Sequence, residues 1–269
     1  MLDRTGNGIG GLGIMAGAVL AFLLLPMLII VWLSFSDSNY TTFPPPALSL
    51  RWYDAVLGSS GWRAAFGLSF IIAAATAAIS VALGIGAALA LVRGSFPFKK
   101  VIYALMLAPL ILPTVITALA IYFFFASMHF AGSAVAIIAG HTVLSLPVAL
   151  IVLCATIQGV DVRLEQAAAS MGASPPVILR RITLPLAAPG LATAAIFAFL
   201  SSFDEFFIAL FLSSPTLQTL PIRIWNSLQY QIEPSVTAVS TLLIALTVGG
   251  LGIAQLLRAV QSRQRSSSR

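Results

Sequence analysis

The stretch "GIMAGAVLAFLLLPMLIIVWLSF", residues 13–35, decides what kind of protein this chain forms. It carries no charged side chain, and it exceeds the roughly 20 apolar residues that a helix needs to cross the hydrocarbon core of a bilayer. A signal-peptide core is shorter and is followed by a cleavage site of small residues, which we do not find here. We therefore expect this stretch to be a retained membrane anchor.

The rest of the chain repeats this pattern. Apolar residues make up 59% of the sequence and charged residues only 8%. The mean hydropathy of +1.02 indicates more apolar surface than a soluble domain can bury. Five further apolar runs cover about residues 64–92, 101–126, 132–157, 187–212 and 236–258. The sequence predicts one all-α, polytopic membrane domain over residues 1–269 with six transmembrane helices, kinked at the prolines inside the runs, Pro109, Pro113 and Pro147.

The basic residues indicate how such a domain is oriented. If the chain crosses six times, only Arg51, Arg63 and Arg223 fall on one side. The other side receives Arg4, Arg93, Lys99, Lys100, Arg163, Arg180, Arg181, Arg258, Arg263, Arg265 and Arg269. This asymmetry follows the positive-inside rule, so both termini are expected in the cytoplasm. The net charge of +6 then reflects topology rather than nucleic-acid binding. We expect the basic tail, residues 259–269, to contact lipid headgroups.

The longest cytoplasmic connection, between the fourth and fifth runs, is expected to form a helical elbow over residues 161–185. Asp161 is placed to cap a first helix, which brings Leu164, Ala167, Ala168 and Met171 to one face. Gly172 suits the left-handed residue that ends such a helix. Ser174 and Pro175 then open a second short helix, which Pro185 is expected to stop. Such an elbow could dock on a protein partner or lie on lipid headgroups, and the pattern alone favours neither.

The elbow resembles the "EAA" loop of ATP-binding-cassette importer permeases, whose signature is Glu-Ala-Ala, three residues, Gly, nine residues, Ile-x-Leu-Pro. The chain matches this spacing with Ala167, Ala168, Gly172, Ile182, Leu184 and Pro185. Gln166 stands where the family usually has glutamate, and Glu165 supplies a neighbouring carboxylate. The segments "LAPLILPTVITALA", "GHTVLSLPVALIV" and "SFDEFFIALFLSS" are similar to the spermidine/putrescine-type branch, and the resemblance covers about residues 62–260.

This resemblance implies a bacterial inner-membrane permease subunit that is not itself an enzyme. It implies pairing with a second permease, usually a different chain, and docking of the elbow on two cytoplasmic ATPase subunits that bind ATP. An external solute-binding protein would deliver the solute. The residues implied to couple the permease to the ATPase are Glu165, Gln166, Ala167, Ala168, Met171, Gly172, Ile182, Leu184 and Pro185.

Two acids, Asp204 and Glu205, lie inside the fifth run, where charged side chains are costly and are candidates for function. They could contact a cationic, polyamine-like solute on the translocation path, or they could serve structure or gating. His141, inside the fourth run, is expected to hydrogen-bond between helices rather than relay protons. The alternative function is a self-contained secondary transporter or channel that uses Asp204, Glu205 and His141 as an ion relay.

The sequence lacks the motifs that are typical of other classes of function. The sequence contains no phosphate-binding loop of the form G-x-x-x-x-G-K-[ST], so ATP is expected on a partner chain and no cofactor on this one. It has neither H-E-x-x-H nor G-x-S-x-G, which argues against a membrane-embedded enzyme. Cys154 is the only cysteine, so neither an internal disulfide nor a cysteine-based metal site is expected.

Overall fold

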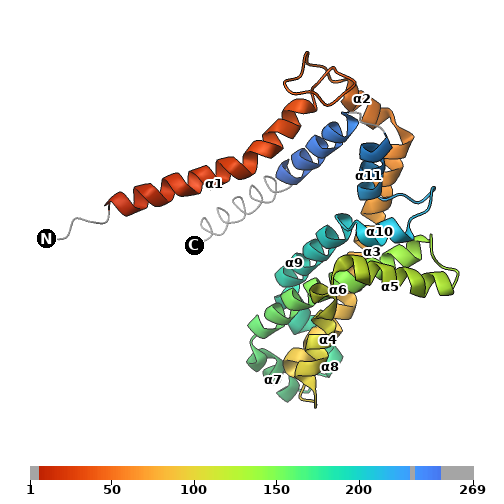
Figure 1. Cartoon of the computed structure of the whole chain (residues 1–269). Coiled ribbons are helices and arrows are strands. Elements are labelled where there is room, and N and C mark those ends of the chain that lie inside the picture. Colours follow the sequence, from red (N-terminus) through yellow and green to blue (C-terminus); the bar gives the residue numbers. More distant parts are fainter. Residues whose placement is uncertain (1–5, 231–233, 250–269) are drawn as a thin grey trace. The chain divides into compact units, whose positions relative to one another are not determined.

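The structure is a computed structural model, and it describes residues 6–230 and 234–249. In these ranges the backbone is almost entirely helical, and its only β-type pairings are two isolated bridges, Ser36 with Leu48 and Ser214 with Leu217. The chain divides into two compact units (Figure 1). The first comprises Met1–Arg63 and Ile224–Arg269, and the second Ala64–Arg223.

The first unit contains α1 (Gly6–Leu33), α2 (Arg51–Gly58) and an apolar helix, Ser235–Gly249. None of the most apolar window of α1 is buried within the chain, as expected for a helix surrounded by lipid or by another membrane subunit. The short helix α2 packs through Trp52 and Val56, both buried. The indole nitrogen of Trp52 donates to the carbonyl of Ser38 at 3.2 Å, which fixes α2 against the preceding loop.

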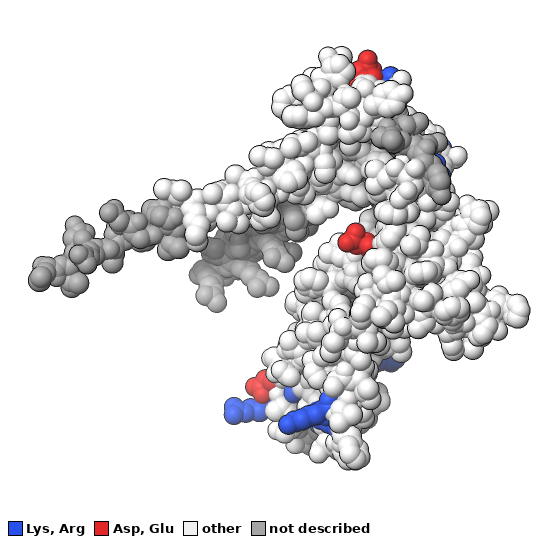
Figure 2. All heavy atoms as spheres, viewed as in Figure 1, with Lys and Arg blue, Asp and Glu red and all other residues white. Residues whose placement is uncertain are grey.

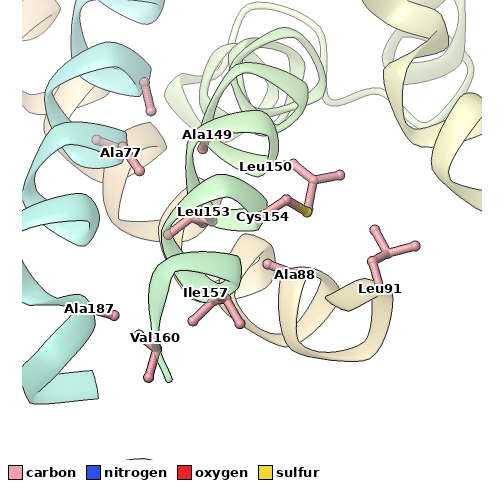
Figure 3. Close-up of a cluster of buried hydrophobic side chains, with 12 residues drawn as sticks. Ala77, Ala88, Leu91, Ala149, Leu150, Leu153, Cys154, Ile157, Val160 and Ala187 are labelled. Atoms are coloured by element: carbon pink, nitrogen blue, oxygen red, sulfur yellow. The ribbon is translucent and has the colours of Figure 1, made fainter. Parts of the chain in front are cut away.

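The second unit is a bundle whose central helix is α6 (Ala134–Gly159). The long helix α3 (Ser60–Arg93) enters this unit at residue 64, and α9 (Leu184–Phe203) packs along α6. Figure 3 shows the labelled side chains of α6 between Ala88 and Leu91 of α3 and Ala187 of α9. Leu150, Leu153 and Ile157 are fully buried there, whereas the neighbouring helices contribute mainly alanines. Small residues on α3 and α9 let the backbones approach α6 closely, which is how membrane helices associate.

Shorter helices complete this unit. The helices α4 (Lys99–Ile111) and α5 (Thr114–Ser127) follow α3, and α10 (Phe207–Leu212) follows α9. The next helix, α11 (Leu220–Tyr230), begins in this unit and continues into the first, whose second segment starts at Ile224. Between α6 and α9 lie α7 (Val162–Ser170), α8 (Pro175–Ile178) and the π-helical turn η1 (Leu179–Thr183).

The third apolar run is not the single kinked helix that its sequence predicts. It forms α4 and α5, which are bent by 101° at the break between them. Leu112 at the break has φ −74° and ψ 143°, an extended conformation, because the ring of Pro113 disfavours the helical region for the residue before it. Pro147, in contrast, lies inside α6 without interrupting that helix.

By length and composition, four described helices could cross a membrane: Gly13–Leu33, Ser60–Arg93, Ala134–Gly159 and Pro175–Phe203. The bent pair α4 and α5 makes a fifth if it counts as one span. The sixth expected run, residues 236–258, is described only as far as Gly249, and the basic tail 259–269 lies outside the described residues.

Candidate functional site

The first half of the elbow folds as its residues predict. The carboxylate of Asp161 accepts from the backbone N–H of Arg163 at 2.9 Å and so caps α7. After Ser170 the helix ends in a Schellman motif, in which Gly172 donates to the carbonyl of Ala169 and Ala173 to that of Ala168, both at 3.0 Å. Gly172 has φ +84°, the left-handed conformation that this motif requires and that glycine adopts without a steric penalty.

The second half of the elbow differs from the prediction. Pro175 does begin α8, with Ser174 at the N-cap position, although the Ser174 hydroxyl makes no capping hydrogen bond. Pro185, however, does not stop a helix, because α8, η1 and α9 run on as one apolar span from Pro175 to Phe203. In η1 the Leu184 N–H bonds to the carbonyl of Leu179, five residues back, so the chain is wound wider immediately before the proline, which has no N–H to donate.

The elbow presents apolar side chains on its outer surface. Met171 is 82% exposed and Leu164 is 47% exposed, and Gln166 and Ala167 are exposed as well. Ala168, in contrast, is buried within the chain at 4% exposure. Ile182 and Leu184 are half-buried, and Pro185 is exposed. The exposed face of α7 therefore centres on Leu164, Ala167 and Met171, and Ala168 belongs to the face that α7 packs against its own unit.

Glu165 lies on that inward face, one turn before Ala168. Its Oε2 accepts from Nε of Arg93 at 3.1 Å, and its Oε1 accepts from the hydroxyl of Thr183 at 2.8 Å. A second guanidinium nitrogen of Arg93 donates to the carbonyl of Val160 at 2.7 Å. The sequence predicts Glu165 in the elbow but does not indicate its partners Arg93 and Thr183, although all three fall on the expected cytoplasmic side.

The two neighbouring acids of the fifth run occupy different environments. They do not lie in a continuous helix, because α9 ends at Phe203 and α10 begins at Phe207. Asp204 is exposed, whereas Glu205 is buried. The Glu205 carboxyl group accepts from the backbone N–H groups of Phe207, Ile208 and Ala209 at 3.0, 2.8 and 3.2 Å, and so caps the start of α10.

The side chain of His141, a residue of α6, lies beside this break. Its Nδ1 lies 2.7 Å from the hydroxyl of Ser202, and its Nε2 lies 3.5 Å from Oε2 of Glu205. His141 and Ser202 are both buried, so the contact is a helix-to-helix polar link in the interior of the second unit. The structure thus brings His141 and Glu205 together and leaves Asp204 outside the cluster.

The charged side chains of the second unit are distributed unevenly. Figure 2 shows several of them at the end that carries α7 and α8, and an acidic group alone in a broad uncharged surface. Uncharged surface is what a segment within the bilayer requires, and an isolated acid on it is a candidate contact for a cation.

Comparison with known proteins agrees with the elbow and the helical architecture. Residues 80–266 match the family model described as "Binding-protein-dependent transport system inner membrane component". The putrescine transport system permease protein PotI of Escherichia coli K12 is 33% identical over 252 residues, covering 91% of this chain and 89% of PotI. The spermidine/putrescine transport system permease protein PotC of the same strain is 26% identical over 231 residues, covering 86% and 87% of the two chains.

A relative with a different named solute also matches. The sulfoquinovosyl glycerol transport system permease protein SmoH of Agrobacterium fabrum is 33% identical over 201 residues, covering 72% of this chain and 67% of SmoH. Among solved structures, a chain of a bacterial ABC transporter involved in the import of the acidic polysaccharide alginate superposes with a TM-score of 0.75. That superposition covers 95% of this chain and 98% of the other at 17% identity, so it supports the fold.

These matches also decide between the two functions that the sequence left open. A self-contained secondary transporter does not fit a family whose members are components of binding-protein-dependent systems. The chain belongs to the family of binding-protein-dependent transport system inner membrane components, the non-catalytic permease subunits of ABC importers.

Proposed function

We propose that this permease imports a small organic cation of the polyamine type. The observation that carries the proposal is the 33% identity to a putrescine permease over 91% of the chain. The exposed carboxylate of Asp204, in the break between α9 and α10, provides a negative charge for such a solute. An ammonium group that leaves water needs an opposite charge to offset its lost hydration.

The importer we propose contains four further subunits: a second permease, two cytoplasmic ATPase subunits that bind ATP, and an external solute-binding protein. This chain contributes six transmembrane helices with both termini in the cytoplasm. The outer face of the elbow, Leu164, Ala167 and Met171, docks on the ATPase together with Gln166. Its exposed apolar surface favours a protein cleft, because burying that surface on a partner is favourable.

Uptake by the reconstituted importer tests the solute. Liposomes containing this chain, its co-purified partners and internal ATP are supplied with labelled putrescine and the binding protein. We expect ATP-dependent uptake that excess spermidine inhibits and sulfoquinovosyl glycerol does not. Uptake of sulfoquinovosyl glycerol with no uptake of putrescine would overturn the proposed solute.

The variant Asp204→Asn tests the proposed contact, with Asp161→Asn as a control for loss of one exposed negative charge. We expect the KM for putrescine to rise about tenfold in Asp204→Asn, since one charged contact to a ligand is worth roughly 1.5–3 kcal/mol. An unchanged KM would place Asp204 off the path of the solute.

A further inference from the structure

We propose that Glu165 is a positioning residue that ties the elbow to two membrane helices, so that a movement of the elbow moves α3 and α9 with it. This inference rests on the proposed coupling of the elbow to an ATPase. It assigns Glu165 to the interior side of the elbow rather than to the docking face.

The two carboxylate oxygens of Glu165 bind residues of two different elements. Oε2 accepts from Arg93, the last residue of α3, at 3.1 Å. Oε1 accepts from Thr183, the last residue of η1, at 2.8 Å. Because η1 leads directly into α9, one side chain of α7 links the ends of α3 and of the span that contains α9.

Arg93 extends this link to the end of α6. Its guanidinium donates to the carbonyl of Val160 at 2.7 Å, in the turn between α6 and α7. A cation at the last residue of α3 is also favoured by the negative end of the helix dipole. Arg93 therefore holds the turn at which the elbow begins, and Glu165 holds α7, the first helix of the elbow.

The burial of these groups indicates a lasting contact rather than a transient surface pair. The side chains of Arg93 and Glu165 are only 26% and 16% exposed, and Thr183 is 2% exposed. Partial burial limits screening by salt and strengthens a charge-assisted hydrogen bond. Both carboxylate oxygens are already bound within this chain, whereas the neighbouring Gln166 is exposed and free to face a partner chain.

The remaining attachments of α7 are less constraining. At the C-terminal end of α7, no atom lies within 4 Å of a Cβ built on Gly172, so this position of the turn is not packed against other side chains. Ala168 is the buried residue of α7, and an alanine supplies little contact area. Without Glu165, α7 would be held by the buried Ala168 and by the turns at its two ends.

The test compares Glu165→Gln, Arg93→Gln and the double variant in the reconstituted importer. Lys100→Gln, an exposed charge at the start of α4, is the matched control. We expect the putrescine imported per ATP hydrolysed to fall roughly three- to thirtyfold in each single variant. The double variant should be no worse than the singles, because both remove the same link. Normal import per ATP in Glu165→Gln, or losses that multiply in the double variant, would overturn the proposal.

A distance measurement tests the link without relying on transport. Nitroxide labels at two exposed positions, Ser170 at the end of α7 and Ser95 just beyond α3, report how firmly the elbow is held. We expect a narrow distance distribution in the parent protein and in Lys100→Gln, and a broader one in Glu165→Gln. An unchanged distribution in Glu165→Gln would contradict a positioning role.

The variant Thr183→Val removes the contact to η1 and keeps the pair with Arg93 and a side chain of similar shape. It should lower import per ATP less than Glu165→Gln does, and it remains informative if Glu165→Gln fails to assemble. Thr183→Val with normal import per ATP would remove α9 from the proposed link. If the parent importer shows no ATP-driven putrescine uptake, the proposed function fails, and the label distances still decide whether Glu165 holds the elbow.

Discussion

At the scale of single residues, the two adjacent acids Asp204 and Glu205 show how position decides the role of a carboxylate. Glu205 is buried and accepts three backbone N–H groups at the start of α10. Asp204, one residue earlier, is exposed. The break in the helix allows this difference, because the Glu205 side chain caps the start of α10 while Asp204 directly follows the last residue of α9. Sequence alone left both acids as candidates for the substrate path.

Replacing each acid by its amide should separate these roles in stability. Glu205→Gln exchanges one acceptor oxygen for an amide nitrogen, so at least one of the three N–H groups loses its acceptor. We expect it to destabilise the protein by at least about 1–2 kcal/mol. Asp204→Asn should change stability by less than about 0.5 kcal/mol, as is usual for an exposed side chain. Thermal unfolding of the purified variants in detergent measures both changes, and equal shifts would contradict the burial seen for Glu205.

Gly172 provides a second prediction at this scale. Its φ of +84° costs a β-branched residue roughly 1–2 kcal/mol, and no neighbouring atom lies within 4 Å of an added Cβ. Gly172→Val should therefore make the elbow more sensitive to proteases, and Gly172→Asn should do so less, because asparagine tolerates this conformation.

Gly159→Ala is the control for Gly172, since an added Cβ there also meets no atom within 4 Å and its φ lies outside the left-handed region. Limited proteolysis followed by mass spectrometry locates the cuts. Equal sensitivity of Gly172→Val and Gly159→Ala would show that backbone strain at residue 172 is unimportant for the elbow.

At the scale of elements, the crossing of α6 and α9 depends on one glycine. A Cβ built on Gly190 would lie 2.0 Å from Oγ1, 2.3 Å from Cγ2 and 2.6 Å from Cβ of Thr156. These distances leave no room for a methyl group, so the two helices approach at the minimum separation that Gly190 allows. Thr156 itself donates to the carbonyl of Val152 at 2.8 Å, which fixes its rotamer against the crossing.

Gly190→Ala should destabilise the second unit by roughly 1–3 kcal/mol, the usual cost of overpacking a well-packed interface. Thr156→Gly should recover part of this loss when combined with Gly190→Ala, since it removes all the clashing side-chain atoms. Gly86→Ala in α3, where no atom lies within 4 Å, serves as the control and should be neutral or slightly stabilising. Chemical denaturation in detergent gives the three values, and a harmless Gly190→Ala would mean that α6 and α9 cross less closely.

Two prolines at this scale have different effects because of their positions. Pro113 follows an extended residue and separates α4 from α5 by a bend of 101°. Pro185 occupies the first turn of α9, where a missing N–H is tolerated after the wider turn of η1. The identity of the residue predicted a disturbance at both places, and hydrogen bonding around each proline decided whether the helix ended.

At the scale of the whole molecule, the charge asymmetry predicts which connections face the cytoplasm. Cys154 is buried, so it can be replaced by serine to give a background for single-cysteine labelling. Cysteines at the exposed positions Thr42 and Ser170 then report the two sides of the membrane.

A membrane-impermeant maleimide applied to intact spheroplasts should label Thr42→Cys and leave Ser170→Cys unlabelled. Permeabilised cells should label both, which controls for reactivity. The reverse pattern would overturn the expected orientation, and labelling of both positions in intact cells would mean that the elbow does not face the cytoplasm.

The sequence by itself determined the helical membrane class, the extent of most apolar spans and the first half of the elbow. These features depend on local properties: hydropathy over about 20 residues, the cap at Asp161 and the left-handed conformation at Gly172. Only the tertiary structure showed that Glu165 binds Arg93 and Thr183, and that Glu205 faces His141 while Asp204 does not. These contacts join residues that are distant in the chain, and helix packing, which brings them together, is not encoded in any one segment.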